Sequence, residues 1–366
     1  MSRFDFRKAL ALRSAWIWPI LGLAALPLAA AGGAGGWMAA LSAIALIGTV
    51  FAAVHHAEVI ASKTGEPFGP LILAIAVTVI EVGLIVSIML GFDTPKPTLA
   101  RDTVFAAVMI ACNGIVGACL LAGGVKHHVQ DFRLQGASAT LAVLAALTAL
   151  TLIVPNVTTT VEGPAFSKSQ TAFAALISLF LYFSFLFIQT VSHRDSFTPT
   201  DDDSADAHAH LAAPTNGATA FSAALLIVSL VCVVLLAKFL TPALEGGIDR
   251  VGAPRGLVGV VIATIVLLPE GIAALRAARA NRLQTSLNLA LGSALASIAL
   301  TIPAIGALSI VADYPIELGL PIKDVVLLAL TLLISVVTLG TGRTTLLQGV
   351  VHLSIFASFV FFVIVP

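Results

Sequence analysis

Two glutamates stand inside long apolar segments of the sequence. Glu81 lies near the middle of LAIAVTVIEVGLIVSIML, and Glu270 lies past the middle of VGVVIATIVLLPEGIAAL. A carboxylate at the centre of a spanning helix is unfavourable by about 2.5–3.5 kcal/mol unless a cation, a proton, a donor or water accompanies it. Since the same oxygens hold either a cation or a proton, both side chains are candidates for ion binding. The simpler alternative is a protonated glutamate that joins two helices.

Other polar groups near these glutamates could add oxygen ligands. Thr78 lies one turn before Glu81, so both share a helix face. Pro269 directly precedes Glu270, and a proline inside a helix releases a main-chain carbonyl. Asn113 stands in a separate apolar run, where its amide oxygen could bind a cation or its amide could join two helices.

A stripe of small and hydroxyl-bearing residues marks a further predicted helix. Its members recur at intervals of three or four residues, which places them on one face. Such a face can pack closely against a neighbour or supply oxygen ligands, and Ser293 and Ser297 are its candidate ligands. The stripe comprises Ser286, Ala290, Ser293, Ser297 and Thr301.

Histidines occur in two different settings. His55, His56 and Glu58 lie close together in AVHHAEVIAS, without the HExxH spacing of a zinc enzyme. We interpret them as a candidate proton relay or gating cluster, with a solvent-reached cluster as the alternative. His352 stands alone in the last apolar run, and we expect it to be a packing residue whose hydrogen-bonding groups are satisfied.

Composition defines the class of protein. The chain has 366 residues, of which 58% are hydrophobic and only 10% are charged, and the formal net charge is zero. The mean hydropathy is +1.04. A soluble enzyme, a disordered chain and a nucleic-acid-binding protein are therefore excluded, whereas an all-α membrane protein in contact with lipid is expected. Nothing in the sequence calls for a cofactor or defines an oligomeric state.

Eleven apolar runs are long enough to be membrane spans. The first could be a signal peptide, but we favour a retained helix because eleven spans make the charge distribution consistent. With the N-terminus in the cytoplasm, twelve Lys and Arg residues lie on the cytoplasmic side and seven on the other, as the positive-inside rule requires. The expected spans are 15–31, 37–61, 68–90, 103–122, 137–154, 169–191, 219–241, 256–275, 284–311, 324–340 and 345–365.

An acidic segment divides the chain. Residues 1–36 form the N-terminal tail and first helix, 37–191 a first group of five helices, 192–218 the acidic loop, and 219–366 a second group of five. An odd number of spans per group predicts two inverted repeats, each with its glutamate on the second span. The loop is either a solvated linker or a cation-sensing regulatory element of the cytoplasmic face. Its candidate regulatory residues are Asp201, Asp202, Asp203, Asp206, His208 and His210.

Several motifs resemble the calcium/proton exchanger family of the cation/Ca²⁺ antiporter superfamily, in particular its bacterial ChaA type. The family's acidic helices, commonly G-N-A-x-E, are matched by residues 77–81 and 266–270, which keep the glutamate and lack the Gly-Asn pair. The motif S-L-x-x-A-L-G-S is matched without gaps by residues 286–293. Residues 123–132 match G-G-x-x-x-x-x-Q-x-F, and residues 56–65 loosely match T-E-E-L-A-x-x-T-G. The segments 112–117 and 269–275 are similar to the ChaA type.

The resemblance implies a secondary active transporter of a bacterial inner membrane. It would exchange cytoplasmic Ca²⁺, and Na⁺ or K⁺, for external protons by alternating access, with Glu81 and Glu270 coupling the ions by competition. Two carboxylates suit one divalent cation with oxygen ligands. The alternatives are a cation channel, which would conduct without proton coupling, and a membrane-embedded metalloenzyme that uses His55, His56 and Glu58.

Overall fold

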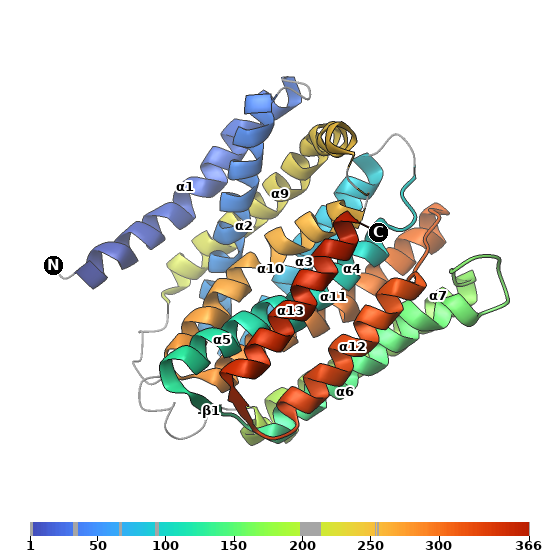
Figure 1. Ribbon diagram of the computed structural model, residues 1–366. Coiled ribbons are helices and arrows are strands. Elements are labelled where there is room, and N and C mark those ends of the chain that lie inside the picture. Colours follow the sequence, from blue (N-terminus) through green and yellow to red (C-terminus); the bar gives the residue numbers. More distant parts are fainter. Residues whose placement is uncertain are drawn as a thin grey trace. The chain divides into compact units, whose positions relative to one another are not determined.

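The structure is a computed structural model. It describes residues 3–31, 36–65, 68–91, 95–197, 214–252, 254 and 256–365, and these residues are predominantly helical (Figure 1). The chain forms two compact units. Unit 1 comprises Met1–Pro95 and Leu211–Ala253, and unit 2 comprises Lys96–His210 and Pro254–Pro366.

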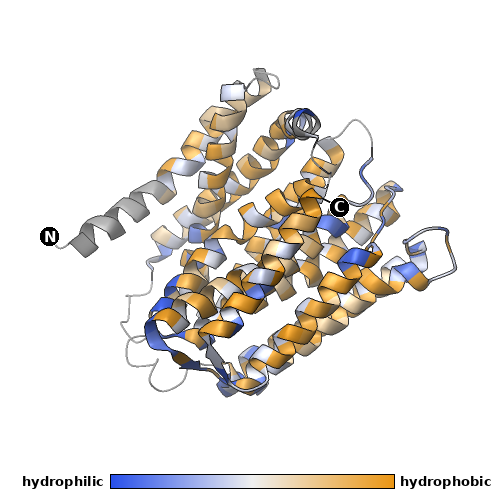
Figure 2. Cartoon of the chain, viewed as in Figure 1, coloured by the Kyte–Doolittle hydropathy of each residue, from blue (hydrophilic) through white to orange (hydrophobic). Residues whose placement is uncertain are grey.

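The apolar helices confirm the predicted class of an all-α, multi-pass membrane protein. Among the described residues, ten helices are long and apolar enough to cross a membrane, and a shorter apolar stretch, Ala15–Pro27, lies in the first helix. These segments coincide with the eleven expected spans. Figure 2 shows hydrophobic colouring along the helices, with strongly hydrophilic colouring at the turns around β1. Apolar side chains on every face are typical of helices that lipid or other helices surround.

The described residues of unit 1 form four helices. α2 packs against the other three, and α3 also packs against α9. Close approach depends on small residues: a Cβ at Gly83 would lie 2.9 Å from Cγ2 of Val234, and Ser87 donates to the Val234 carbonyl over 2.7 Å. These contacts hold α3 against α9. The helices are α1 (Arg3–Ala31), α2 (Gly36–Thr64), α3 (Phe68–Gly91) and α9 (Asn216–Val251).

The first half of unit 2 begins with one continuous span that contains a π-helical turn. This span consists of α4 (Leu99–Met109), the π-turn η1 (Ile110–Ile115) and α5 (Val116–His127). The short strand β1 (Val129–Asp131) follows it. The next two spans are α6 (Leu134–Thr148) with η2 (Ala149–Ile153) and η3 (Val154–Val157), and α7 (Lys168–Phe187) with η4 (Ile188–Ser192) and η5 (Arg194–Ser196).

The second half of unit 2 is built around α11. This helix packs against α4, α5, α6, α7 and α10, and it buries Ala294, Leu295, Ile298 and Ala299. Complete burial of these side chains makes α11 the centre of the unit. The elements are α10 (Gly256–Arg279), α11 (Leu283–Ala312), α12 (Ile322–Leu339), β2 (Arg343–Thr345) and α13 (Leu346–Ile364).

Three turns of unit 2 meet at one end, which we call the sheet end. β1 pairs antiparallel with β2, with Gln130 opposite Thr344. Gln130 Nε2 also donates to the Ala278 carbonyl over 3.0 Å, at the end of α10. Since the turns after α5, α10 and α12 share these bonds, the three helices end on the same side of the unit.

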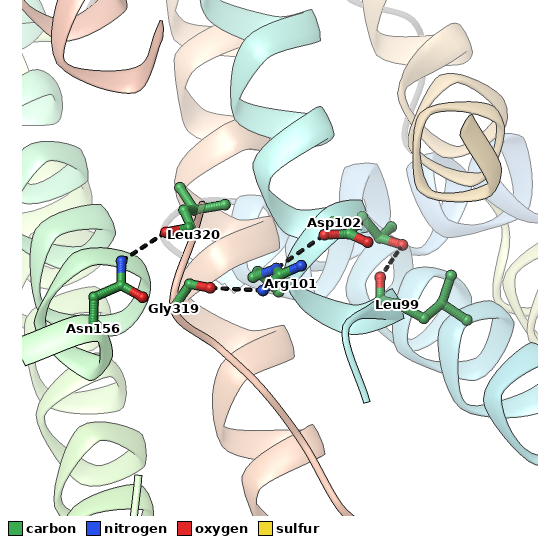
Figure 3. A network of polar contacts seen from close by, with 7 residues as sticks. Leu99, Arg101, Asp102, Asn156, Gly319 and Leu320 are labelled. Carbon is green, nitrogen blue, oxygen red and sulfur yellow. Dashed lines mark hydrogen bonds and ion pairs between the residues drawn. The ribbon is translucent and has the colours of Figure 1, made fainter. Parts of the chain in front are cut away.

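The opposite end, which we call the Arg101 end, joins the start of α4 to the segments before α7 and α12. Arg101 Nη1 donates to the Gly319 carbonyl over 2.7 Å, and Asn156 Nδ2 donates to the Leu320 carbonyl over 2.7 Å (Figure 3). Gly319 N donates to the Pro164 carbonyl over 2.9 Å. With the sheet end, these bonds show that the spans of unit 2 alternate in direction.

Some helices extend beyond the apolar runs that predicted them. α1 begins at Arg3, although the first apolar run was placed at 15–31, and α9 ends at Val251 rather than near residue 241. Main-chain hydrogen bonds do not require apolar side chains, so a helix can continue past its apolar stretch. The predicted ranges therefore marked the apolar stretches rather than the helix ends.

Candidate functional site

Glu81 is a buried carboxylate of unit 1. It lies on α3 and is 3% exposed, and Thr78, three residues earlier on the same face, is also buried. α3 packs against both α2 and α9. The structure therefore places these two predicted site residues side by side in the interior of one unit.

Glu270 is an enclosed carboxylate of unit 2. It lies on α10, and surrounding protein atoms cover both carboxylate oxygens. Pro269 has no N–H, so the Ile265 carbonyl lacks the donor that an unbroken helix would supply. A carboxylate and this main-chain oxygen would then lie on neighbouring turns of α10.

The face of α10 beside Glu270 packs closely on the first span of unit 2. A Cβ at Gly259 would lie 2.8 Å from the main chain of Asp102, and a Cβ at Gly271 would lie 3.2 Å from Ile115 Cδ1. Gly271 follows Glu270 directly, and Ile115 belongs to η1. Glu270 therefore lies level with the π-turn along the length of the unit.

Asn113 is completely buried on this π-turn. Its amide nitrogen donates to Thr331 Oγ1 over 2.9 Å, and its amide oxygen lies 3.0 Å from His352 Nδ1. His352 Nε2 lies 3.2 Å from Thr338 Oγ1. The predicted candidate ligand thus belongs to a buried network that links the π-turn to α12 and α13. π-turns are frequent at functional sites, so the position of Asn113 on one is consistent with a functional role.

His352 is a buried residue whose ring nitrogens are satisfied, as the sequence predicted. Both of its ring nitrogens have hydrogen-bond partners, and its side chain is fully buried. The available signal was an isolated histidine in an apolar helix. Its partners could not be identified because Asn113 lies 239 residues earlier in the chain.

The serine stripe lies on α11 as predicted. Ser286, Ser297 and Thr301 are buried, and Ser293 is half-buried. α11 packs against α10 and η1. Unit 2 therefore holds hydroxyl groups, the Glu270 carboxylate and the Asn113 amide on three mutually contacting elements.

The two histidines of the α2 pair differ in burial: His55 is half-buried and His56 is buried. His56 is fully buried, and its Nε2 lies 3.1 Å from the Ala15 carbonyl of α1. The ring centroids of His55 and His56 are 5.6 Å apart, and Glu58 is exposed. Among the described residues, no group of three or more His, Cys, Asp or Glu side chains could hold a metal ion. The relay role of this cluster stays a prediction.

The candidate regulatory residues of the acidic loop lie outside the described residues. The chain leading to this loop is described up to Phe197, which is buried and whose carbonyl accepts from Asn288 Nδ2 over 2.7 Å. The start of the loop is therefore attached to α11 at the sheet end.

An ion pair that the sequence did not reveal lies at the Arg101 end. Arg101 Nε is 2.9 Å from Asp102 Oδ1, and the two side chains are 11% and 21% exposed (Figure 3). Asp102 lies in the first turn of α4, where the helix dipole favours a negative charge. Adjacent residues of opposite charge in the sequence were the available signal.

A second ion pair at this end is exposed. Lys168 Nζ contacts Asp313 Oδ1 just beyond the end of α11. The hydrogen bond from Lys168, together with its charge, lowers the pKa of Asp313 below the ordinary aspartate value. Because both side chains are largely exposed, this pair contributes little to stability.

The comparisons with known proteins identify the class. The chain matches the sodium/calcium exchanger protein family over residues 35–191 and 221–365. It therefore belongs to this family of membrane exchangers, and the resemblance noted from the sequence motifs is confirmed. The protein is a cation exchanger rather than an enzyme.

Individual relatives make the likeness more specific. The chain is 35% identical to the sodium-potassium/proton antiporter ChaA of Escherichia coli over 347 residues, which cover 94% of each protein. It is 48% identical over 326 residues to y4hA of Sinorhizobium fredii, described as an ionic transporter, covering 89% of this chain and 88% of the relative. The fold is similar to that of native YfkE, with a TM-score of 0.73 at 16% identity, covering 95% of this chain and 100% of YfkE.

Proposed function

We propose that this protein exchanges cytoplasmic cations for external protons across a bacterial inner membrane. The carrying observation is that a carboxylate is enclosed in each unit, Glu81 on α3 and Glu270 on α10. Buried carboxylates in a spanning bundle mark ion or proton pathways. The likeness to ChaA, a sodium-potassium/proton antiporter by name, supports the proposal that this protein exchanges monovalent cations for protons.

Competition for the same oxygens would couple the two ions. At the external side, where protons are more available, protonation of Glu81 and Glu270 would release the cation. At the cytoplasmic side, loss of the protons would restore the negative charges and favour cation binding. Alternating access of the inverted repeats would connect these two states. Carboxylate oxygens would suit Ca²⁺, and partial protonation of these side chains would favour Na⁺ or K⁺.

The oxygen groups beside the carboxylates would complete the ligand set. Thr78 lies on the face of Glu81, and Ser293, Ser297 and Asn113 lie on elements that contact α10 or one another in unit 2. Hydroxyl and amide oxygens are suitable ligands for hard cations. We assign these four residues as cation ligands that assist the two glutamates.

The orientation of the protein follows from its basic residues. We place the sheet end in the cytoplasm and the Arg101 end outside, which puts the N-terminus inside. Among the described residues of unit 2, the sheet end carries more Lys and Arg than the opposite end, in accord with the positive-inside rule. At the sheet end these are Lys126, Arg133, Arg194, Arg276, Arg279, Arg282 and Arg343, and at the Arg101 end Lys96, Arg101, Lys168 and Lys323.

Everted membrane vesicles with a preformed pH gradient test this function. Addition of Ca²⁺, Na⁺ or K⁺ should dissipate the gradient, and Glu81→Gln or Glu270→Gln should abolish the response because an amide cannot exchange a proton. Glu162→Gln is the matched control, since Glu162 is exposed in the turn before α7. Normal dissipation by both buried-site variants would contradict the site, and conductance without proton movement would indicate a channel.

A further inference from the structure

A buried hydrogen-bond network fixes the side chain of Asn113. The amide nitrogen of Asn113 donates to Thr331, so its amide oxygen faces His352 and accepts. Thr331 in turn donates to the Leu327 carbonyl over 2.7 Å. All four side chains of the network, Asn113, Thr331, Thr338 and His352, are buried. An amide held at both ends cannot rotate without losing bonds that water does not replace there.

The same network determines the tautomer of His352. Since Asn113 Oδ1 can only accept, His352 Nδ1 carries the proton and donates to it. His352 Nε2 then has a lone pair and accepts from the hydroxyl of Thr338. A neutral imidazole satisfies both side-chain partners in this arrangement. The Thr338 hydroxyl, which can donate or accept, is therefore compatible with the tautomer that Asn113 requires.

We propose that His352 is a positioning residue, which orients the Asn113 amide oxygen for the transported cation. This inference rests on the proposed function. A carbonyl oxygen has two lone pairs, so a bond from His352 leaves capacity for a cation. Asn113 lies on η1, level with Glu270 through the contact between Gly271 and Ile115. Amide and carboxylate oxygens are suitable ligands for the same hard cation.

Four of the basic groups on neighbouring elements have partners of their own. α13 packs against α5, η1, α10, α12 and β2. Lys126 and His127 bond to the Arg279 carbonyl, Lys323 bonds to the Phe362 carbonyl, and Arg343 pairs with Asp131. The proposed role of His352 requires a neutral donor and no change of charge. The titratable and charged groups on these five elements are Cys112, Cys119, Lys126, His127, Glu270, Arg276, Arg279, Lys323, Asp324 and Arg343.

Substitution of His352 by asparagine or by glutamine distinguishes the roles of its two ring nitrogens. The amide group of asparagine lies where Nδ1 lies in histidine, and that of glutamine reaches the place of Nε2. His352→Asn should therefore keep the donor to Asn113, whereas His352→Gln should lose it. We expect His352→Gln to raise the cation concentration for half-maximal gradient dissipation about two- to tenfold, the size of one buried hydrogen bond. His352→Asn should stay within about twofold of wild type.

Neither the asparagine nor the glutamine side chain can take up a proton. The same two variants therefore also test whether His352 binds a transported proton. If both shift the pH profile of exchange equally, His352 carries a proton and the positioning role is wrong. Equal half-saturation in wild type and both variants also overturns it. Ser354→Ala, on an exposed part of α13, should leave the half-saturating concentration unchanged. Failure of the proposed function itself would appear separately, as normal exchange in Glu81→Gln and Glu270→Gln.

Thr331 provides a second route that does not alter the histidine. Thr331→Val removes the acceptor of the Asn113 amide nitrogen, and Thr331→Ser keeps it. The valine variant should raise the half-saturating cation concentration, and the serine variant should restore it. Size-exclusion chromatography of each purified variant shows whether it folds. Identical values for valine and serine variants that both fold would contradict the proposal.

Discussion

Arg101 donates to the main-chain carbonyl of Gly319 over 2.7 Å, although 218 residues separate the two in the chain. The bond joins the first turn of α4 to the segment that leads into α12. Gly319 itself is confined: a Cβ there would lie 2.1 Å from Asn156 Oδ1 and 2.8 Å from Pro164 Cβ. The Arg101 end therefore tolerates no side chain at this position.

Gly319→Ala should destabilise the protein. The added methyl group would displace Asn156, whose amide nitrogen holds the Leu320 carbonyl, and would press on Pro164. Overpacking of this kind reduces stability by about 1–3 kcal/mol. Thermal unfolding of the detergent-purified protein measures the change. Gly292→Ala in α11 is the control, because no atom lies within 4 Å of its Cβ position and alanine favours helix. An unchanged Tm for Gly319→Ala would contradict this packing.

The ion pair between Lys168 and Asp313 should stabilise the folded protein weakly, and this stabilisation should disappear at acidic pH. Lys168 lowers the pKa of Asp313, so the folded protein binds this proton less readily than the unfolded chain. The stabilisation is complete above the ordinary aspartate pKa of about 3.9 and is lost as the pH falls through the lower folded-state pKa. The Tm difference between wild type and Asp313→Asn should therefore shrink on acidification. A Tm difference that grows at low pH would contradict the predicted direction of the pH dependence. Lys168→Gln should lower the Tm in the same way as Asp313→Asn.

Single cysteines should report which side of the membrane each end faces. Thr341→Cys at the sheet end and Glu162→Cys at the Arg101 end are both exposed positions. An impermeant maleimide should label Thr341→Cys in everted vesicles and Glu162→Cys in intact cells. The native cysteines Cys112, Cys119 and Cys232 are buried and should add little background. The reverse labelling pattern would invert the proposed topology.

The spans were predictable because lipid imposes a simple rule. Apolar side chains must cover a helix for about 20 residues, and the chain's scarce charges mark where each helix leaves that environment. The same rule made Glu81 and Glu270 conspicuous. Their burial agrees with the sequence interpretation, whereas their ligand role stays a prediction.

Long-range polar contacts were not predictable from this sequence. Asn113 and His352 each lie in apolar runs, and nothing local indicates that they meet across 239 residues. The π-turn was equally hidden, since IACNGI differs little in composition from the α-helical segments on either side. Hydrogen-bond partners depend on which helices become neighbours, and hydrophobic periodicity does not specify that.

The π-turn η1 lies between two parts of one membrane span, α4 and α5, which both pack against α10 and α11. An extra residue in the turn offsets the side chains after it by about 100° from the positions of an unbroken α-helix. Before the offset, the main chain at Asp102 meets Gly259 of α10. After it, Gly117 meets His352 and Leu353 of α13. Deleting one residue within 110–115 would therefore rotate α5 relative to α4, so that a helix of nearly unchanged length would present the wrong surface to the helices around it.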